Sequence, residues 1–194
     1  MSGRKARSTA TVEDQESAIL AAAATEFAAV GARRANMDEV AAAAGVSRST
    51  LYRRFPNKEG LLLAVANDAY EKGMLRLEAA VVGLGPREAV VEAFATGAEM
   101  VGTDPLLSRM VLEDYEVRGV TASINTLFIA MVTDRVAESL REAGATMPDD
   151  RLHQAVELHV RLVISYLENP AEPERATPEY VRDMAETFLA PMIY

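Results

Sequence analysis

Residues 36–62 read NMDEVAAAAGVSRSTLYRRFPNKEGLL, which predicts two short helices around a glycine turn and the start of a third helix. Asn36 can cap the first helix, and Glu39, three residues later, completes the pattern of a capping box. Gly45 follows the last apolar residue of that helix, where a glycine readily takes the positive φ that ends a helix. Ser47 can cap the second helix, so the stretch predicts a helix-turn-helix that reads DNA.

The second helix, predicted over residues 48–55, carries few apolar residues and many cationic and hydroxyl-bearing ones. Leu51 and Phe55, four residues apart, can seat it on a core. The remaining face suits the major groove of DNA, where arginine reads guanine and serine or threonine reads several bases. Tyr52 and Arg54 are placed to reach phosphates, and Lys58 has the charge to do so from the next helix. The predicted DNA-contacting residues are Asn36, Ser47, Arg48, Ser49, Thr50, Tyr52, Arg53, Arg54 and Lys58.

The stretch from Asn36 to Leu62 resembles the amino-terminal DNA-binding domain of the TetR family of bacterial transcriptional repressors. The matching positions include Met37, Val40, Ala41, Ala44 to Ser47, Thr50 to Tyr52, Phe55, Asn57 to Glu59, and Leu61 with Leu62. Residues 19–31 also resemble the first helix of that domain, with Ile19, Ala23, Phe27 and Val30 facing inward and Gly31 at its end. The chain departs from the family pattern at Glu26, Asn36 and Arg54. The alternative interpretation is a helical hairpin that only packs, with Arg54 as a solvated surface charge.

The charges divide unevenly along the chain. Residues 1–60 carry a net charge of +2 and residues 61–194 a net charge of −11, which together give −9. Nucleic-acid binding depends on the local potential, so the acidic average does not exclude it. Arg4, Lys5 and Arg7 form a short basic arm that either adds DNA contacts or serves as a plain soluble tail.

The 194 residues predict one small DNA-binding domain and one larger helical domain, with boundaries at 1–10 for the arm, 11–57 for the helix-turn-helix domain and 58–194 for the body. The absence of cysteine excludes disulfides and thiolate metal sites and fits a reducing cytosol. The charged amino terminus is unlike a signal peptide, and no run reaches the roughly 18 apolar residues needed to cross a bilayer. We therefore expect a cytoplasmic protein without membrane contact.

Prolines, glycines and capping residues divide the rest of the chain into helices, so the predicted fold class is all-α with about nine helices. After the three helices of the DNA-binding domain, the expected helices cover residues 58–82, 86–102, 105–115, 121–143, 149–168 and 178–190.

The last two helices carry more apolar surface than one partner helix can cover. The principal stripes are Leu152, Val156, His159, Val163 and Tyr166 in one helix, and Val181, Met184, Phe188 and Met192 in the other. Further apolar residues widen both faces, namely Leu158, Leu162 and Leu167, and Ala185, Leu189 and Ile193. We predict a twofold-symmetric four-helix interface between two copies of the chain, as the family resemblance also implies, and hence a palindromic operator. Core packing within one chain is the alternative.

The helices between residues 58 and 143 resemble the family's ligand-binding region. Large apolar and aromatic residues there are candidates for lining a small-molecule pocket, although such residues also build ordinary cores. They are Tyr70, Met74, Phe94, Met100, Met110, Tyr115, Phe128 and Met131. Acidic residues beside Tyr115 either attract a cationic ligand or form a solvated helix end.

The sequence contains no phosphate-binding glycine loop, no nucleophile elbow and no metal-binding histidine pair, because His153 and His159 are six residues apart. We therefore expect neither an enzyme nor a cofactor or metal. The predicted function is that of a homodimeric DNA-binding transcriptional regulator, a repressor by family resemblance, which an unidentified small-molecule effector releases from its double-stranded DNA operator. The alternative is a helical small-molecule-binding or scaffold protein without specific DNA binding.

Overall fold

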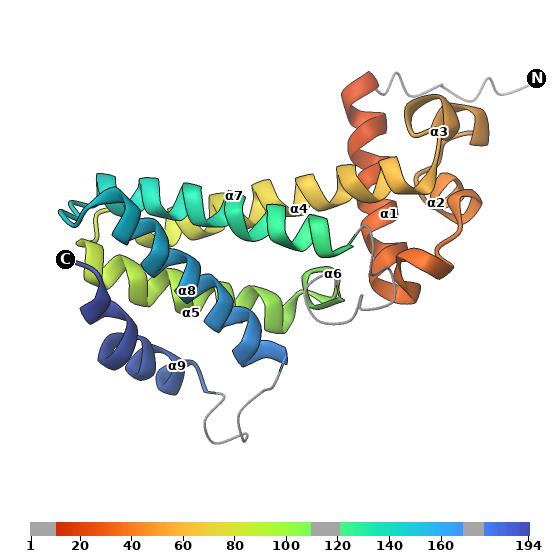
Figure 1. The fold of residues 1–194 in the computed structure, drawn as a ribbon. Coiled ribbons are helices and arrows are strands. Elements are labelled where there is room, and N and C mark those ends of the chain that lie inside the picture. Colours follow the sequence, from red (N-terminus) through yellow and green to blue (C-terminus); the bar gives the residue numbers. More distant parts are fainter. Residues whose placement is uncertain (1–10, 110–120, 169–176) are drawn as a thin grey trace, which may run out of the picture. The chain divides into compact units, whose positions relative to one another are not determined.

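The computed structural model describes residues 11–109, 121–168 and 177–194 (Figure 1). Within these ranges the chain forms nine α-helices and no strand, which confirms the predicted all-α class. The basic arm, Met110 and Tyr115 lie outside the described residues. The chain divides into two compact units between Asp68 and Ala69, and each unit is described by itself. The functional boundary at residue 58 remains a prediction.

The first unit contains α1 (Val12–Arg34), α2 (Met37–Ala43), α3 (Arg48–Arg54) and the start of α4 (Lys58–Val81). Its core joins one face from each helix. The residues with no more than 2% exposure are Ile19, Ala23, Phe27, Val40, Ala41, Leu51, Leu61 and Val65. These positions follow helical spacing, so burial of the inward faces holds the four helical segments together.

The first helix begins earlier than the resemblance indicates, because a capping box precedes it. The Thr11 backbone N–H donates to the Asp14 carboxylate at 2.8 Å, and the Asp14 N–H donates to the Thr11 hydroxyl at 3.1 Å. The Thr11 backbone N–H, and after it the Thr11 side chain, stabilise the Asp14 carboxylate by hydrogen bonding and lower the pKa of Asp14. Gly31 takes a φ of 78° and kinks the helix where the sequence places its end.

The helix-turn-helix follows the predicted caps with one correction. Asn36 accepts a hydrogen bond from the Asp38 N–H at 2.9 Å, as an N-cap does. However, the Asn36 N–H donates to Glu26 of α1 at 3.1 Å, so Glu39 does not complete a capping box. Gly45 has a φ of 67° in the turn, which explains the glycine there.

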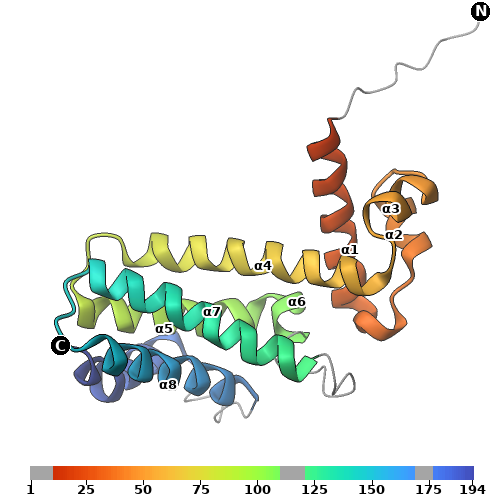
Figure 2. The ribbon, with the colours of Figure 1, turned by 45° about the horizontal axis from the view of Figure 1, so that its top comes forward.

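The second unit contains the rest of α4 together with α5 (Pro86–Thr103), α6 (Pro105–Ser108), α7 (Thr121–Glu142), α8 (Asp149–Glu168) and α9 (Pro178–Met184). Helix α5 packs against α7, α8 and α9, while α7 and α8 pack together (Figure 2). The expected helix at 178–190 forms, but it is α-helical only as far as Met184. After α9 the chain forms a π-helical turn at Ala185–Leu189 and a 3₁₀ turn at Ala190–Met192, where Pro191 cannot donate a helical hydrogen bond. No helix in the described ranges has the length and apolar character required to cross a membrane.

Candidate DNA interface and ligand cavity

Buried residues in the first unit fix the orientation of α3. Leu51 is fully buried and Phe55 is 9% exposed, so this side of the helix lies on the core. Ser47 caps the helix by accepting the Thr50 N–H at 3.1 Å, and its hydroxyl also lies 2.8 Å from the Thr50 hydroxyl. The opposite face of α3 is therefore held toward solvent by the packing of Leu51.

The exposed face of α3 combines cations with hydroxyl groups. The Arg48 side chain is 72% exposed and forms an ion pair with Asp38 of α2 at 3.0 Å. Tyr52 is 44% exposed although it is aromatic. Ser49 and Arg53 are also exposed, and Thr50 is partly buried. A helix face of this chemistry can place donors against base edges and phosphates.

Arg54, Lys58 and Asn36, three of the predicted DNA-contacting residues, have side-chain partners inside the protein, and their contact with DNA stays a prediction. Arg54 is only 14% exposed and binds the Glu16 carboxylate at 2.7 Å. Lys58 donates to the carbonyl oxygens of Arg33 at 2.7 Å and Ala35 at 3.0 Å, where it satisfies free carbonyls at the end of α1. The Asn36 side chain caps α2. These contacts explain why a lysine is tolerated in the first turn of α4.

A cavity of about 120 Å³ lies in the second unit between α4, α5, α7 and α8. Of the predicted pocket residues, Phe94, Met100 and Phe128 line it. Five residues of α8 also line it, namely Val156, His159, Val160, Val163 and Ile164. Three of these, Val156, His159 and Val163, were predicted for the dimer interface, and the structure places them on the inner side of α8.

His159 is the polar exception in the cavity wall. Its side chain is 8% exposed, and its Nε2 atom has no hydrogen-bond partner among the described residues. Burial lowers its pKa to about 4, because the charged imidazolium loses its hydration there. The ring is therefore neutral at physiological pH.

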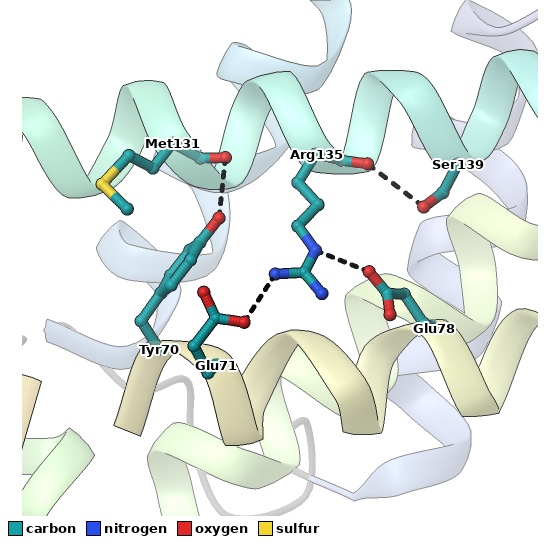
Figure 3. A network of polar contacts seen from close by, with 6 residues as sticks. All are labelled: Tyr70, Glu71, Glu78, Met131, Arg135 and Ser139. Atoms are coloured by element: carbon teal, nitrogen blue, oxygen red, sulfur yellow. Dashed lines mark hydrogen bonds and ion pairs between the residues drawn. The ribbon is translucent and has the colours of Figure 1, made fainter. Parts of the chain in front are cut away.

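The other predicted pocket residues of the described chain, Tyr70, Met74 and Met131, do not line this cavity. Tyr70 instead joins α4 to α7, donating its hydroxyl to the Met131 carbonyl at 3.2 Å (Figure 3). Its ring also meets the Phe128 ring edge-on. Beside it, Arg135 of α7 binds Glu78 at 2.6 Å and Glu71 at 2.9 Å on α4. These hydrogen bonds raise the pKa of Arg135. This polar network fixes α7 against the second half of α4.

Tyr70→Phe is expected to lower the free energy of unfolding by about 1 kcal/mol, because the Met131 carbonyl loses one partly buried hydrogen-bond donor while the ring packing is kept. Urea denaturation followed by circular dichroism measures the change. Tyr194→Phe is the matched control, since Tyr194 is 59% exposed, and should leave the midpoint within error. Equal effects of the two substitutions would contradict the role assigned to the Tyr70 hydroxyl.

The predicted dimer stripes are largely internal to one chain. Leu152 and Val156 are each 1% exposed and Val181 is 6% exposed, so these residues belong to the core of the second unit. Met184, Met192 and Tyr166 pack against that core while remaining partly buried. Phe188, a member of the second predicted stripe, is by contrast 67% exposed, and Leu158 and Leu162, which widen the stripe of α8, are 50% and 46% exposed. The residues that widen the stripe of α8 are therefore the ones that face outward.

Two comparisons with protein families cover most of the chain. Residues 19–65 match the bacterial regulatory proteins of the tetR family, and residues 86–187, more than half of the chain, match the bacterial tetracyclin repressor C-terminal domain. The protein belongs to the TetR family. It is a DNA-binding transcriptional regulator of that family, with the helix-turn-helix in the first match and the cavity lining, apart from Leu77, in the second. A comparison with curated proteins found no match.

Solved structures share the TetR fold over nearly the whole chain. Salmonella enterica GusR has a TM-score of 0.72 at 21% identity, covering 96% of this chain and 99% of GusR. The TetR family repressor AlkX from Dietzia sp. strain DQ12-45-1b, implicated in biodegradation of n-alkanes, has a TM-score of 0.65 at 22% identity, with 91% and 98% covered. AibR, in complex with isovaleryl coenzyme A and operator DNA, has a TM-score of 0.62 at 23% identity, with 91% and 98% covered.

The structure gives Glu26 and His159 roles that their sequence positions in this TetR-family chain did not predict. Glu26 stands where the family pattern is apolar, and its hydrogen bond to the Asn36 N–H gives the departure a structural reason. His159 was assigned to an interface because it shares a helical stripe with Leu152 and Val156. The signal in the sequence is a single histidine within an otherwise apolar helical stripe. Because the chain buries this stripe, the histidine lines the cavity.

Proposed function

We propose that this TetR-family regulator is a homodimeric repressor that binds a palindromic operator through α3 and leaves it when a small molecule occupies the cavity. The observation that carries the proposal is the outward face of α3, where Arg48, Ser49, Tyr52 and Arg53 are exposed above the buried Leu51. Arginine, serine and tyrosine are side chains that contact base edges and phosphates in a major groove. Because the target is chromosomal DNA, we place the protein in the bacterial cytoplasm.

The exposed apolar side chains of the second unit support a dimer. Leu158 and Leu162 are four residues apart on α8 and therefore lie on the same helix face, and Phe188 adds a large exposed ring after α9. Exposed apolar side chains that lie together are typical of protein interfaces, as Leu158 and Leu162 do on one face of α8. The occupant we propose is a second copy of the chain, since a twofold arrangement presents two α3 helices to two DNA half-sites.

The cavity and α4 provide a route for the effector signal. Leu77 of α4 lines the cavity, and the same helix begins at Lys58 in the first unit. The Arg135 and Tyr70 contacts tie α4 to α7, which also lines the cavity. We propose that the effector shifts the population between two positions of α4 and thereby changes the separation of the two α3 helices.

Selection of bound sites from a random DNA pool tests the DNA-binding part of this proposal. We expect an enriched palindrome whose half-site centres are about 10 base pairs, or a multiple of that distance, apart. Affinity for the selected site should exceed affinity for unrelated DNA by at least about 1000-fold and fall with rising salt. A folded protein that enriches no motif at low salt would instead support the alternative, a helical small-molecule-binding or scaffold protein.

A further inference from the structure

The ligand cavity has one polar side chain in its wall. Apolar residues from α4, α5, α7 and α8 form the rest of the lining, whereas His159 brings an imidazole into it from α8. The ring is buried, and its Nε2 atom has no hydrogen-bond partner in the described parts of the chain. Buried polar atoms without partners are uncommon in folded proteins, so this nitrogen needs an explanation.

Water is a poor partner for this nitrogen. A buried water typically makes two to four hydrogen bonds, but the lining offers it the imidazole of His159 and otherwise apolar side chains. An ordered water at this position would form one hydrogen bond with His159 and would lack partners for the others. A molecule that is apolar except for one polar group can contact the apolar lining and also pair with the imidazole of His159.

The size of the cavity and its lack of charge define that molecule further. The volume of about 120 Å³ is close to that of an engineered apolar cavity of about 150 Å³ that binds benzene, so roughly one ring fits. The lining contains no carboxylate, lysine or arginine, and burial keeps the imidazole neutral by lowering its pKa to about 4. A charged ligand would lose its hydration without gaining a counter-charge.

We propose that the effector is an uncharged molecule of about one ring's size that is apolar except for a hydroxyl group, and that this hydroxyl pairs with His159 Nε2. A hydroxyl both donates and accepts, so it can pair with either tautomer of the ring. The inference rests on the proposed function only in calling this molecule the effector. Binding itself is a property of the second unit and requires no DNA.

Isothermal titration calorimetry on the full-length protein tests this with phenol, toluene and benzoate, which share a ring and differ in one substituent. We expect phenol to bind most tightly and benzoate most weakly. His159→Leu should weaken phenol binding by about tenfold, as expected for one hydrogen bond in an apolar site, while changing toluene binding by less than about twofold. If the role of His159 were purely structural, the substitution would weaken the binding of phenol and toluene by the same factor.

Ala93→Leu is the matched control, because Ala93 lines the same cavity and the larger side chain occupies space without removing the imidazole. This substitution should weaken the binding of phenol and the binding of toluene to a similar extent. An unchanged ratio of phenol to toluene affinity in His159→Leu, or no binding of phenol to the wild type, overturns the proposal. If phenol binds through His159 but the protein enriches no operator, the ligand assignment stands and the proposed regulatory function fails.

Discussion

A variant carrying Leu162→Glu and Phe188→Glu is expected to be a monomer. Leu162 is 46% exposed on α8, and Phe188 is 67% exposed after α9, so neither side chain supports the core of its own chain. In a twofold interface each substitution occurs twice, and each buried leucine or phenylalanine contributes about 1.5–3 kcal/mol. The dimer dissociation constant should therefore rise by at least about 1000-fold.

Analytical ultracentrifugation measures this change, with the monomer sedimenting as one chain of 21.0 kDa. The matched control carries Leu75→Glu and Leu127→Glu, which add the same charge at apolar side chains that are 59% and 60% exposed on α4 and α7. This control should stay dimeric, and circular dichroism should show both variants to be folded. A double variant at Leu162 and Phe188 that remains dimeric would place the interface elsewhere.

The sequence predicted the helix-turn-helix well because its signals are local. Asn36, Gly45 and Ser47 act through backbone hydrogen bonds and dihedral angles within a few residues of themselves, and the structure places each in the expected cap or turn. The partners of Arg54 and Lys58 were not predictable in this way. Arg54 meets Glu16 and Lys58 meets Arg33, contacts that bridge 38 and 25 residues of sequence.

The second unit shows more clearly what helical periodicity cannot predict. Helical spacing correctly grouped Leu152, Val156 and His159 on one face, but spacing does not say which neighbour covers that face. The structure buries it against helices of the same chain and leaves Leu158 and Leu162 outside. Tyr70 illustrates the same limit, because its hydroxyl bonds to Met131, a partner 61 residues away.

Arg48→Ala is expected to change the DNA sequence that the protein selects, whereas Tyr52→Ala should weaken binding to all sequences. Arg48 is 72% exposed and can exchange its ion pair with Asp38 for a guanine edge. One such base contact is worth about 1–3 kcal/mol, and a symmetric dimer loses it in both half-sites. Affinity for the original operator should thus fall by about 30-fold or more.

Repeating the selection from random DNA with each variant separates the two roles. Arg48→Ala should lose the base preference at one symmetric pair of positions, while Tyr52→Ala should recover the original motif with lower affinity. Tyr52→Phe is the matched control, because it keeps the ring and removes only the hydroxyl proposed to reach a phosphate. If Tyr52→Phe binds as the wild type does, the ring and not the hydroxyl makes the contact. An unaltered motif from Arg48→Ala would show that Arg48 contributes charge to the interface without reading a base.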